Sequence, residues 1–180
     1  MKRLSSISGI ANPYSRRILA HVIDKDPVRI LAATPSRLRR LTRGLSKVQL
    51  KKNAEKGKWS IAQLVNHLSD TEVVLAFRLR MAIAQSGSPL QAMDERKWAD
   101  GLRYRNADVG RKLVVFETMR RDHVRMLKSL PKTVWRRYGM HQERGKETVT
   151  RMAQMYAGHD LNHLQQIRKI RSWLLKGEHR

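Results

Sequence analysis

The sequence predicts an all-α protein built as a single four-helix bundle. Four long stretches carry apolar residues at the three- and four-residue spacing of an amphipathic helix. Gly, Pro and polar segments separate these stretches, and strand signals are absent apart from a short turn expected near Tyr138–His141. Four amphipathic helices joined by loops bury their apolar faces most simply against one another, which favours a bundle.

The first two helices are expected over residues 27–45 and 61–85. The first opens at Pro27 and is expected to restart at Thr34-Pro35, where Thr can cap a helix and Pro suits its first turn. The second follows a capping-box pattern, Ser60 with Gln63, and runs about seven turns without Gly or Pro.

The second half of the chain holds the other two long helices. Residues 90–107 read as a loop with one short helix near Asp94–Trp98, and the third helix runs from about residue 108 to 130, where Pro131 ends it. Residues 131–147 look irregular, and the fourth helix spans about 148–176. The expected organisation is an N-terminal extension, partly ordered, then the bundle, then a short tail. Their ranges are 1–26, 27–176 and 177–180.

Length and composition narrow the class of protein. A chain of 180 residues fits one domain, and its cysteine count of 0 excludes thiolate metal sites and cysteine nucleophiles. The absence of cysteine agrees with a cytoplasmic setting. No stretch approaches the roughly 20 apolar residues that span a bilayer, and the N-terminus lacks the apolar run of a signal peptide, so no membrane association is expected.

The charge is strongly positive, with 38 Lys+Arg against 15 Asp+Glu and a formal net charge of +23. Such a field attracts polyanions whether or not binding them is the function. One alternative is therefore a basic nucleic-acid-binding helical protein, and another is a solvated basic surface. Against nucleic-acid recognition, we find no helix-turn-helix or zinc-finger motif, and aromatic residues make up only 6% of the chain.

Two histidines of the fourth helix face the bundle interior. His159 and His163 are four residues apart and fill a gap in an apolar series with helical spacing. The other members are Val149, Met152, Tyr156, Ile167, Ile170 and Leu174. Buried imidazoles need hydrogen bonds or a metal ion, and the pair alone is compatible with both.

A third histidine lies on the inward stripe of the second helix. His67 shares this stripe with Leu64, Thr71 and Val74, and three inward imidazoles from two helices are harder to explain by packing alone. Three protein ligands leave a coordination position open for water or substrate, as in catalytic zinc sites. The remaining histidines are expected at the surface: His21, His123, His141 and His179.

The segments KWSIAQLVNHLSDTEVVLAFRLR, MDERKWAD and LPKTVWRRYGMHQERGKETVTRMAQMYAGHDLNHLQQI resemble the DinB-like (YfiT-like) superfamily. The resemblance implies a four-helix bundle with a three-histidine metal site, whose ligands map onto His67, His159 and His163. It also implies zinc or nickel as the ion, and homodimers as a common assembly. Members with known activities are similar to thiol-dependent S-transferases and a thiol-dependent isomerase.

The leading hypothesis is a metal-dependent transferase or hydrolase that acts on a small molecule. Such an enzyme would bind one divalent metal ion, and a transferase would also use a low-molecular-weight thiol as cosubstrate. The competing hypothesis, besides nucleic-acid binding, is a structural or regulatory bundle that a metal merely stabilises.

Several residues near the histidines are candidates for supporting roles. Asp70 could orient an imidazole or accept a proton, or it could pair with a cation of the third helix. Arg78 could bind an anionic substrate group and Tyr156 could line the pocket, although a solvated arginine and a core tyrosine are the alternatives. Asn66 and Asn162 flank two of the histidines. The four tryptophans are expected to pack at the bundle ends: Trp59, Trp98, Trp135 and Trp173.

Overall fold

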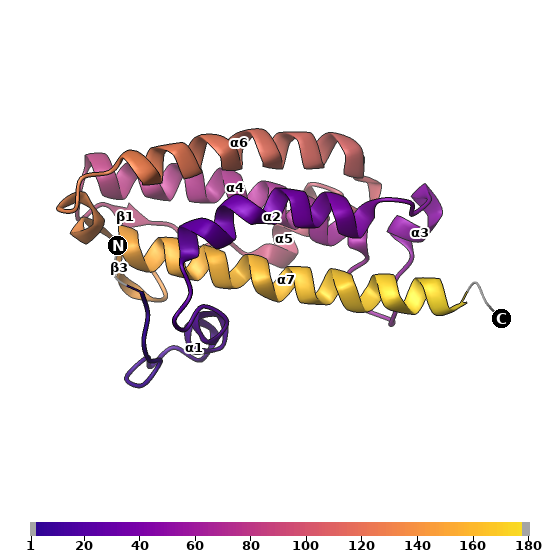
Figure 1. Ribbon diagram of the computed structural model, residues 1–180, viewed down its shortest axis with the longest axis horizontal. Helices are drawn as coiled ribbons and strands as arrows, with labels where there is room; N and C mark the ends of the chain where they lie inside the picture. The colour runs from indigo at the N-terminus through magenta and orange to yellow at the C-terminus, as the bar shows by residue number, and fades with distance from the viewer. Residues whose placement is uncertain (1–2, 178–180) are drawn as a thin grey trace.

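The computed structural model describes residues 3–177 and is dominated by four long helices (Figure 1). These are α2 (Pro27–Thr42), α4 (Ile61–Ala84), α6 (Val109–Ser129) and α7 (Val149–Gly177). Helix α2 packs against α6 and α7, and α4 packs against the same two helices. The four helices therefore form a closed bundle, as the sequence predicted.

Side-chain caps fix where three of these helices begin. Asp26 accepts hydrogen bonds from the backbone N–H groups of Val28 and Arg29, and Asp108 accepts one from Arg111. Ser60 and Gln63 form the expected capping box at the start of α4. Each cap satisfies N–H groups that have no partner inside the helix, so the local sequence determines where these three helices begin.

Helix α2 does not restart at Thr34-Pro35, and this expectation is wrong. The helix continues through Pro35 from Pro27 to Thr42. A proline inside a helix leaves the carbonyl four residues earlier without its N–H donor. That carbonyl belongs to Leu31, and it accepts a hydrogen bond of 3.3 Å from Nη1 of Arg120 on α6. A tertiary contact thus replaces the helical hydrogen bond that proline removes.

Short elements connect the long helices. In chain order they are α3 (Lys47–Lys51), β1 (Pro89–Leu90), α5 (Glu95–Gly101), η1 (Tyr104–Asn106), η2 (Val134–Arg136), β2 (Tyr138–His141) and β3 (Gly145–Thr148). Strand β1 pairs parallel to β2, and β2 pairs antiparallel to β3. The segment expected to be irregular, residues 131–147, therefore contributes β2 and most of β3 to a small three-stranded sheet, and β1 joins it from the region after α4. A Cβ atom at position 139 would collide with the side chain of Leu90, so the close packing of β1 on β2 favours glycine there.

The N-terminal extension contains an additional helix, α1 (Pro13–Ala20), which packs across α7 (Figure 1). Ile18 and Leu19 are fully buried in this contact. The backbones approach closely because residue 158 is glycine: a Cβ there would lie 2.2 Å from the carbonyl oxygen of Ile18. The extension is thus part of the packed structure over these residues.

The core consists of two apolar clusters separated by a layer of polar side chains. One cluster includes Leu75 and Met152, and the other includes Leu64 and Ile167. Between them every long helix contributes buried polar groups, which we call the polar belt: Thr34, His67, Glu72, Arg120, His123, His159, Asp160 and His163. Within residues 3–177, no helix has the length and apolarity needed to traverse a bilayer.

Candidate metal centre

The three predicted histidines converge at one point in the polar belt. The Nε2 atom of His159 lies 3.0 Å from Nε2 of His67 and 3.0 Å from Nε2 of His163. All three side chains are buried, and one nitrogen from each lies within 4.8 Å of the others. Imidazole nitrogens bind zinc at about 2.0–2.1 Å. Nitrogens this close together can therefore share one ion.

The three imidazoles are neutral near pH 7. Burial lowers the pKa of His67 to about 3, with a smaller contribution from the neighbouring His163. Burial also lowers the pKa of His163 to about 4, and it holds the pKa of His159 well below its ordinary value. Neutral imidazole is the form that binds a metal ion, because one ring nitrogen keeps a free lone pair.

The hydrogen bond of His163 fixes which of its nitrogens is free. Its Nδ1 lies 2.9 Å from Oε1 of Gln166, which can only accept, so the single ring proton sits on Nδ1 and Nε2 carries the lone pair. The Nδ1 atoms of His67 and His159 are buried without a hydrogen-bond partner. The protein therefore orients one ligand through a side chain and the other two by packing.

Hydrogen bonding among the imidazoles cannot account for this geometry. His163 has no Nε2 proton to donate, so at most one of the two 3.0 Å contacts can be a well-formed hydrogen bond. In every arrangement of the ring protons, at least one of these two contacts is therefore left without a well-formed hydrogen bond inside a desolvated site, which is unfavourable. A divalent cation at this point would satisfy all three nitrogens. The residues present therefore fit a metal ion.

A buried ion-pair network in the polar belt holds the helices around the histidines. The guanidinium of Arg120 bridges Glu72 on α4, at 2.6 Å, and Asp160 on α7. His123 was expected at the surface, but this is wrong: it is 2% exposed, and its Nδ1 lies 2.6 Å from Oε1 of Glu72. Burial alone would raise the pKa of Glu72, but Arg120 and His123 outweigh it and lower that pKa. The network joins α4, α6 and α7 one helical turn from the metal ligands.

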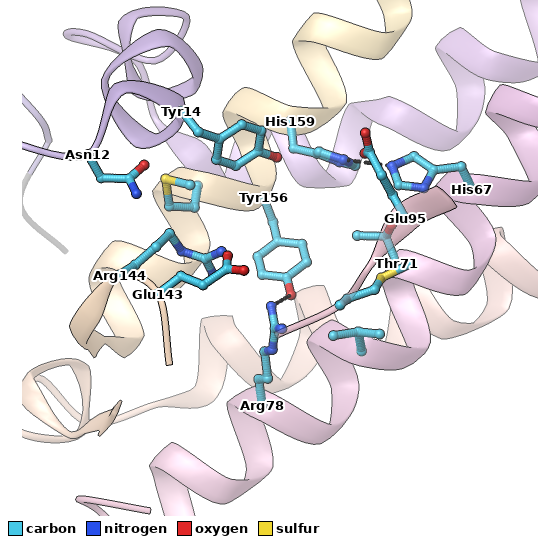
Figure 2. Close-up of a pocket in the computed structure, with 13 residues that line it drawn as sticks. Asn12, Tyr14, His67, Thr71, Arg78, Glu95, Glu143, Arg144, Tyr156 and His159 are labelled. Carbon is cyan, nitrogen blue, oxygen red and sulfur yellow. Dashed lines mark hydrogen bonds between the residues drawn. The ribbon is translucent and has the colours of Figure 1, made fainter. Parts of the chain in front are cut away.

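A cavity of about 260 Å³ opens beside the histidines, and His67 and His159 line its inner end (Figure 2). Figure 2 shows the ring of Tyr156 between His159 and Arg78, and Nη1 of Arg78 donates a 3.2 Å hydrogen bond to the Tyr156 hydroxyl. Arg78 is only 6% exposed and also donates to the carbonyl of Gln91. The structure thus brings together the two residues that the sequence suggested for substrate binding.

Arg78 is a buried cation without a carboxylate partner among the residues the structure describes. Its hydrogen bonds go to neutral oxygens of Tyr156 and Gln91. Arg144, which also lines the cavity, is instead paired with Glu147 at 2.7 Å. A buried charge without a counter-ion is costly, so Arg78 is the group in this cavity most suited to an anionic ligand.

Asp70 turns away from the three imidazoles toward α6. Its Oδ1 accepts a 3.0 Å bond from Nζ of Lys112, while its Oδ2 is buried without a partner. Burial first, and then the Asp70 charge, raise the pKa of the nearby Tyr104. Of the roles expected for Asp70, the structure shows the ion pair with a cation of the third long helix, α6. A role for Asp70 as proton acceptor stays a prediction.

Trp59 is part of the site surroundings, because its ring centroid lies 5.0 Å from that of His67. Asn66 is buried with its Oδ1 unpartnered, and Asn162 accepts a 3.4 Å hydrogen bond from Arg17 of α1. His141 was expected at the surface, but this is wrong, since it is the last residue of β2 and is only 3% exposed. His21 is half-buried, and His179 lies outside the described residues.

Sequence reasoning missed the residues that complete the cavity: Asn12 and Tyr14 of α1, Glu95 of α5, and Glu143 and Arg144 between β2 and β3. In Figure 2 the Glu95 carboxylate lies beside the rings of His67 and His159. These residues sit in short elements whose position depends on tertiary packing, and no local periodicity marks them.

The fold and the site define a four-helix bundle with three buried, converging imidazoles that could hold a metal ion beside an open cavity. A sequence profile of the DinB superfamily matches residues 30–167, which include all three histidines. The chain belongs to the DinB superfamily.

Similar proteins support this assignment. A protein from Oceanobacillus iheyensis is 24% identical over 152 residues, covering 84% of this chain and 88% of its own. One from Bacillus mycoides is 26% identical over 161 residues, covering 89% and 92%. Both are provisionally named metal-dependent hydrolases. YfiT from Bacillus subtilis, described as a probable metal-dependent hydrolase with an unusual four-helix bundle topology, shares the fold with a TM-score of 0.75 at 19% identity, covering 80% of this chain and 83% of its own.

Proposed function

We propose that this protein is a metal-dependent enzyme that acts on a small anionic molecule. The observation that carries the proposal is the convergence of three neutral imidazoles, two of which line a cavity that also contains a buried arginine without a carboxylate partner. The names of the curated relatives support metal dependence and hydrolysis. Zinc and nickel are the ions we propose, since both accept imidazole ligands.

A divalent ion held by His67, His159 and His163 would supply Lewis-acid chemistry, including a lowered pKa for a water or thiol ligand. The chain's own residues would position the substrate. Arg78 would bind an anionic group of the substrate, and the hydrogen bond to Tyr156 would orient the guanidinium toward the cavity. The apolar clusters on either side of the polar belt would limit water to the cavity mouth.

Two reaction types fit this arrangement. Hydrolysis is favoured by the names of the relatives, and transfer to a low-molecular-weight thiol is suggested by the resemblance to thiol-dependent S-transferases. A screen of activated esters, amides and alkyl halides, with and without added thiols, separates the two. Hydrolysis requires turnover without thiol, whereas transfer requires a thioether or thioester product that contains the added thiol.

The metal site is tested by elemental analysis of protein purified without a histidine tag. We expect about one zinc or nickel ion per chain, because three ligands in one buried site bind a single ion. The His159→Ala/His163→Ala variant should lose it, while the half-buried His21→Ala control should retain it. Metal-free wild type, or a double variant that keeps its full metal content, would refute the proposal. A bundle that metal merely stabilises would lose folding stability in chelator but show no turnover in the screen.

The role of Arg78 is tested on an active substrate from that screen. Arg78→Gln removes the positive charge from the cavity, so KM for an anionic substrate should rise about tenfold or more, in line with the worth of a charge-assisted hydrogen bond. The KM of an uncharged analogue should change little. Equal effects on both substrates would show that Arg78 only supports the cavity wall.

A further inference from the structure

A second concave site lies between α2 and α7, next to the end of α1. It encloses about 310 Å³ and shares no lining residue with the cavity at the metal centre. Every ionisable side chain that lines it is basic: His21, Lys25, Arg37, Arg40 and Arg168. We call this site the basic groove.

Helical periodicity places these cations around an apolar floor. On α2, Arg37 and Arg40 lie one turn apart, with Leu41 beside them. On α7, Leu161 and Leu164 fall on the same face as Arg168. His21 and Lys25 close the end of the groove after α1. The charged groups therefore surround the rim while leucine side chains form the base.

The cations of the basic groove have no acidic partner among the side chains the structure describes. The other α2 arginines are paired elsewhere: Arg29 with its own cap Asp26, and Arg39 with Glu117 of α6 at 2.7 Å. The Nζ of Lys25 bonds only the carbonyl oxygen of His21, at 2.8 Å. Other ion pairs lie in the polar belt and between α4 and α6, away from the groove. The positive charges of the groove are therefore not neutralised by a neighbouring carboxylate.

Gathering like charges in a concave surface raises the local positive potential. Burial lowers the pKa of His21, and the charges of Lys25 in the groove and of Arg17 lower it further. Four permanent cations exceed what a single carboxylate could neutralise. Arginine matches phosphate oxygens with paired N–H donors, which makes phosphate the anion that the groove suits best.

We propose that the basic groove binds ligands that carry two or more phosphate groups, independently of the histidine site. No Phe, Tyr or Trp lines the groove, so the phosphates themselves are expected to supply most of the contacts. A free oligophosphate and the backbone of a nucleic acid share this chemistry. The experiment below distinguishes these two sources.

The test uses the full-length protein and titrates two probes, inorganic tripolyphosphate and a short DNA duplex, at about 0.15 M salt, where long-range attraction is screened. Arg37→Gln/Arg40→Gln removes two groove charges. The matched control, Arg111→Gln/Arg125→Gln, removes two charges from exposed positions of α6. Isothermal titration calorimetry gives the affinities, and circular dichroism checks that each variant is folded.

We expect the groove variant to lose about tenfold or more in affinity for tripolyphosphate, at about 1.4 kcal/mol per tenfold change, and the control to lose less than about threefold. The same pattern with DNA assigns the groove to a nucleic-acid backbone, while binding of tripolyphosphate alone assigns it to a free oligophosphate. Equal losses in both variants, or no binding of either probe, would overturn the proposal. Binding should persist in His159→Ala/His163→Ala, so this result and the metal-site result can fail separately.

Discussion

At the scale of single residues, the most constrained side chain is Arg120. It is 2% exposed and donates to Glu72, to Asp160 and to the Leu31 carbonyl that Pro35 leaves without a helical donor. One planar guanidinium thus serves three helices at once. This residue explains why α2 can pass through a proline, and why two buried carboxylates are tolerated beside the metal ligands.

We predict that Arg120→Lys destabilises the protein by about 3–5 kcal/mol, although it keeps the charge. An ammonium group cannot form the paired, planar contacts to both carboxylates, so it leaves buried polar atoms unsatisfied. The free energy of unfolding in urea measures the effect. Arg121→Lys, an exposed neighbour on the same helix, should change it by less than about 1 kcal/mol. A similarly small change for Arg120→Lys would show that the network contributes little.

The three converging histidines could be found from the sequence because each occupies a position in a helical apolar series. The same reasoning failed for His123 and His141. His123 is buried against Glu72, which lies 51 residues away in the chain, and a partner at that separation leaves no local trace. His141 belongs to β2 of a small sheet whose formation the sequence hardly signals. Periodicity therefore identifies side chains that face the bundle axis but not those buried by irregular segments.

At the scale of elements, the long helices were predictable, and so was the short helix expected near Asp94–Trp98, which is α5, but the other short elements were not. The caps at Ser60 and Asp108 and the apolar repeats fix the long helices locally. The strands have two to four residues each, too few for an alternating pattern to stand out. Helix α1 has eight residues, and its place depends on Gly158 of α7. These elements supply most of the cavity residues that were missed.

Helix α1 should therefore be sensitive to a single methyl group. We predict that Gly158→Ala lowers stability by about 2 kcal/mol or more, because a Cβ 2.2 Å from the Ile18 carbonyl forces α1 away from α7. Limited proteolysis should then cut the N-terminal segment faster. Gly101→Ala, where a Cβ would meet nothing within 4 Å, is the matched control. If the two variants behave alike, α1 is not held by this close contact.

At the scale of the whole molecule, the polar belt divides the core into two apolar halves. The belt contains both the three converging histidines and the ion-pair network, so the candidate metal site and the buried charges lie in the same layer. Away from this belt, the basic groove gathers four of the 38 Lys and Arg side chains at one site. Composition predicted the sign of the surface potential, but only the packing of α2 on α7 shows where it is focused.

The buried histidines should make the metal-free protein sensitive to mild acid. The pKa of His67 is about 3 and those of His163 and His141 are about 4 in the folded state, against about 6.5 in an unfolded chain. Below about pH 6.5 the unfolded chain therefore binds more protons than the folded protein, so acid favours unfolding. The stability that these neutral rings provide is complete above about pH 6.5 and declines as the pH falls toward 4.

We expect the free energy of unfolding of chelator-treated protein to fall by several kcal/mol in total from pH 7.5 to pH 4.5, at about 1.4 kcal/mol for each unit of pKa difference that is expressed. Urea denaturation followed by circular dichroism at a series of pH values measures this slope. His67→Phe removes one of the titrating rings and should flatten the curve, whereas the half-buried His21→Gln should leave most of the slope in place. A stability that stays level or rises across this interval would mean that the imidazoles are not held neutral in the polar belt, and the lone pairs needed to bind a metal ion would not be free.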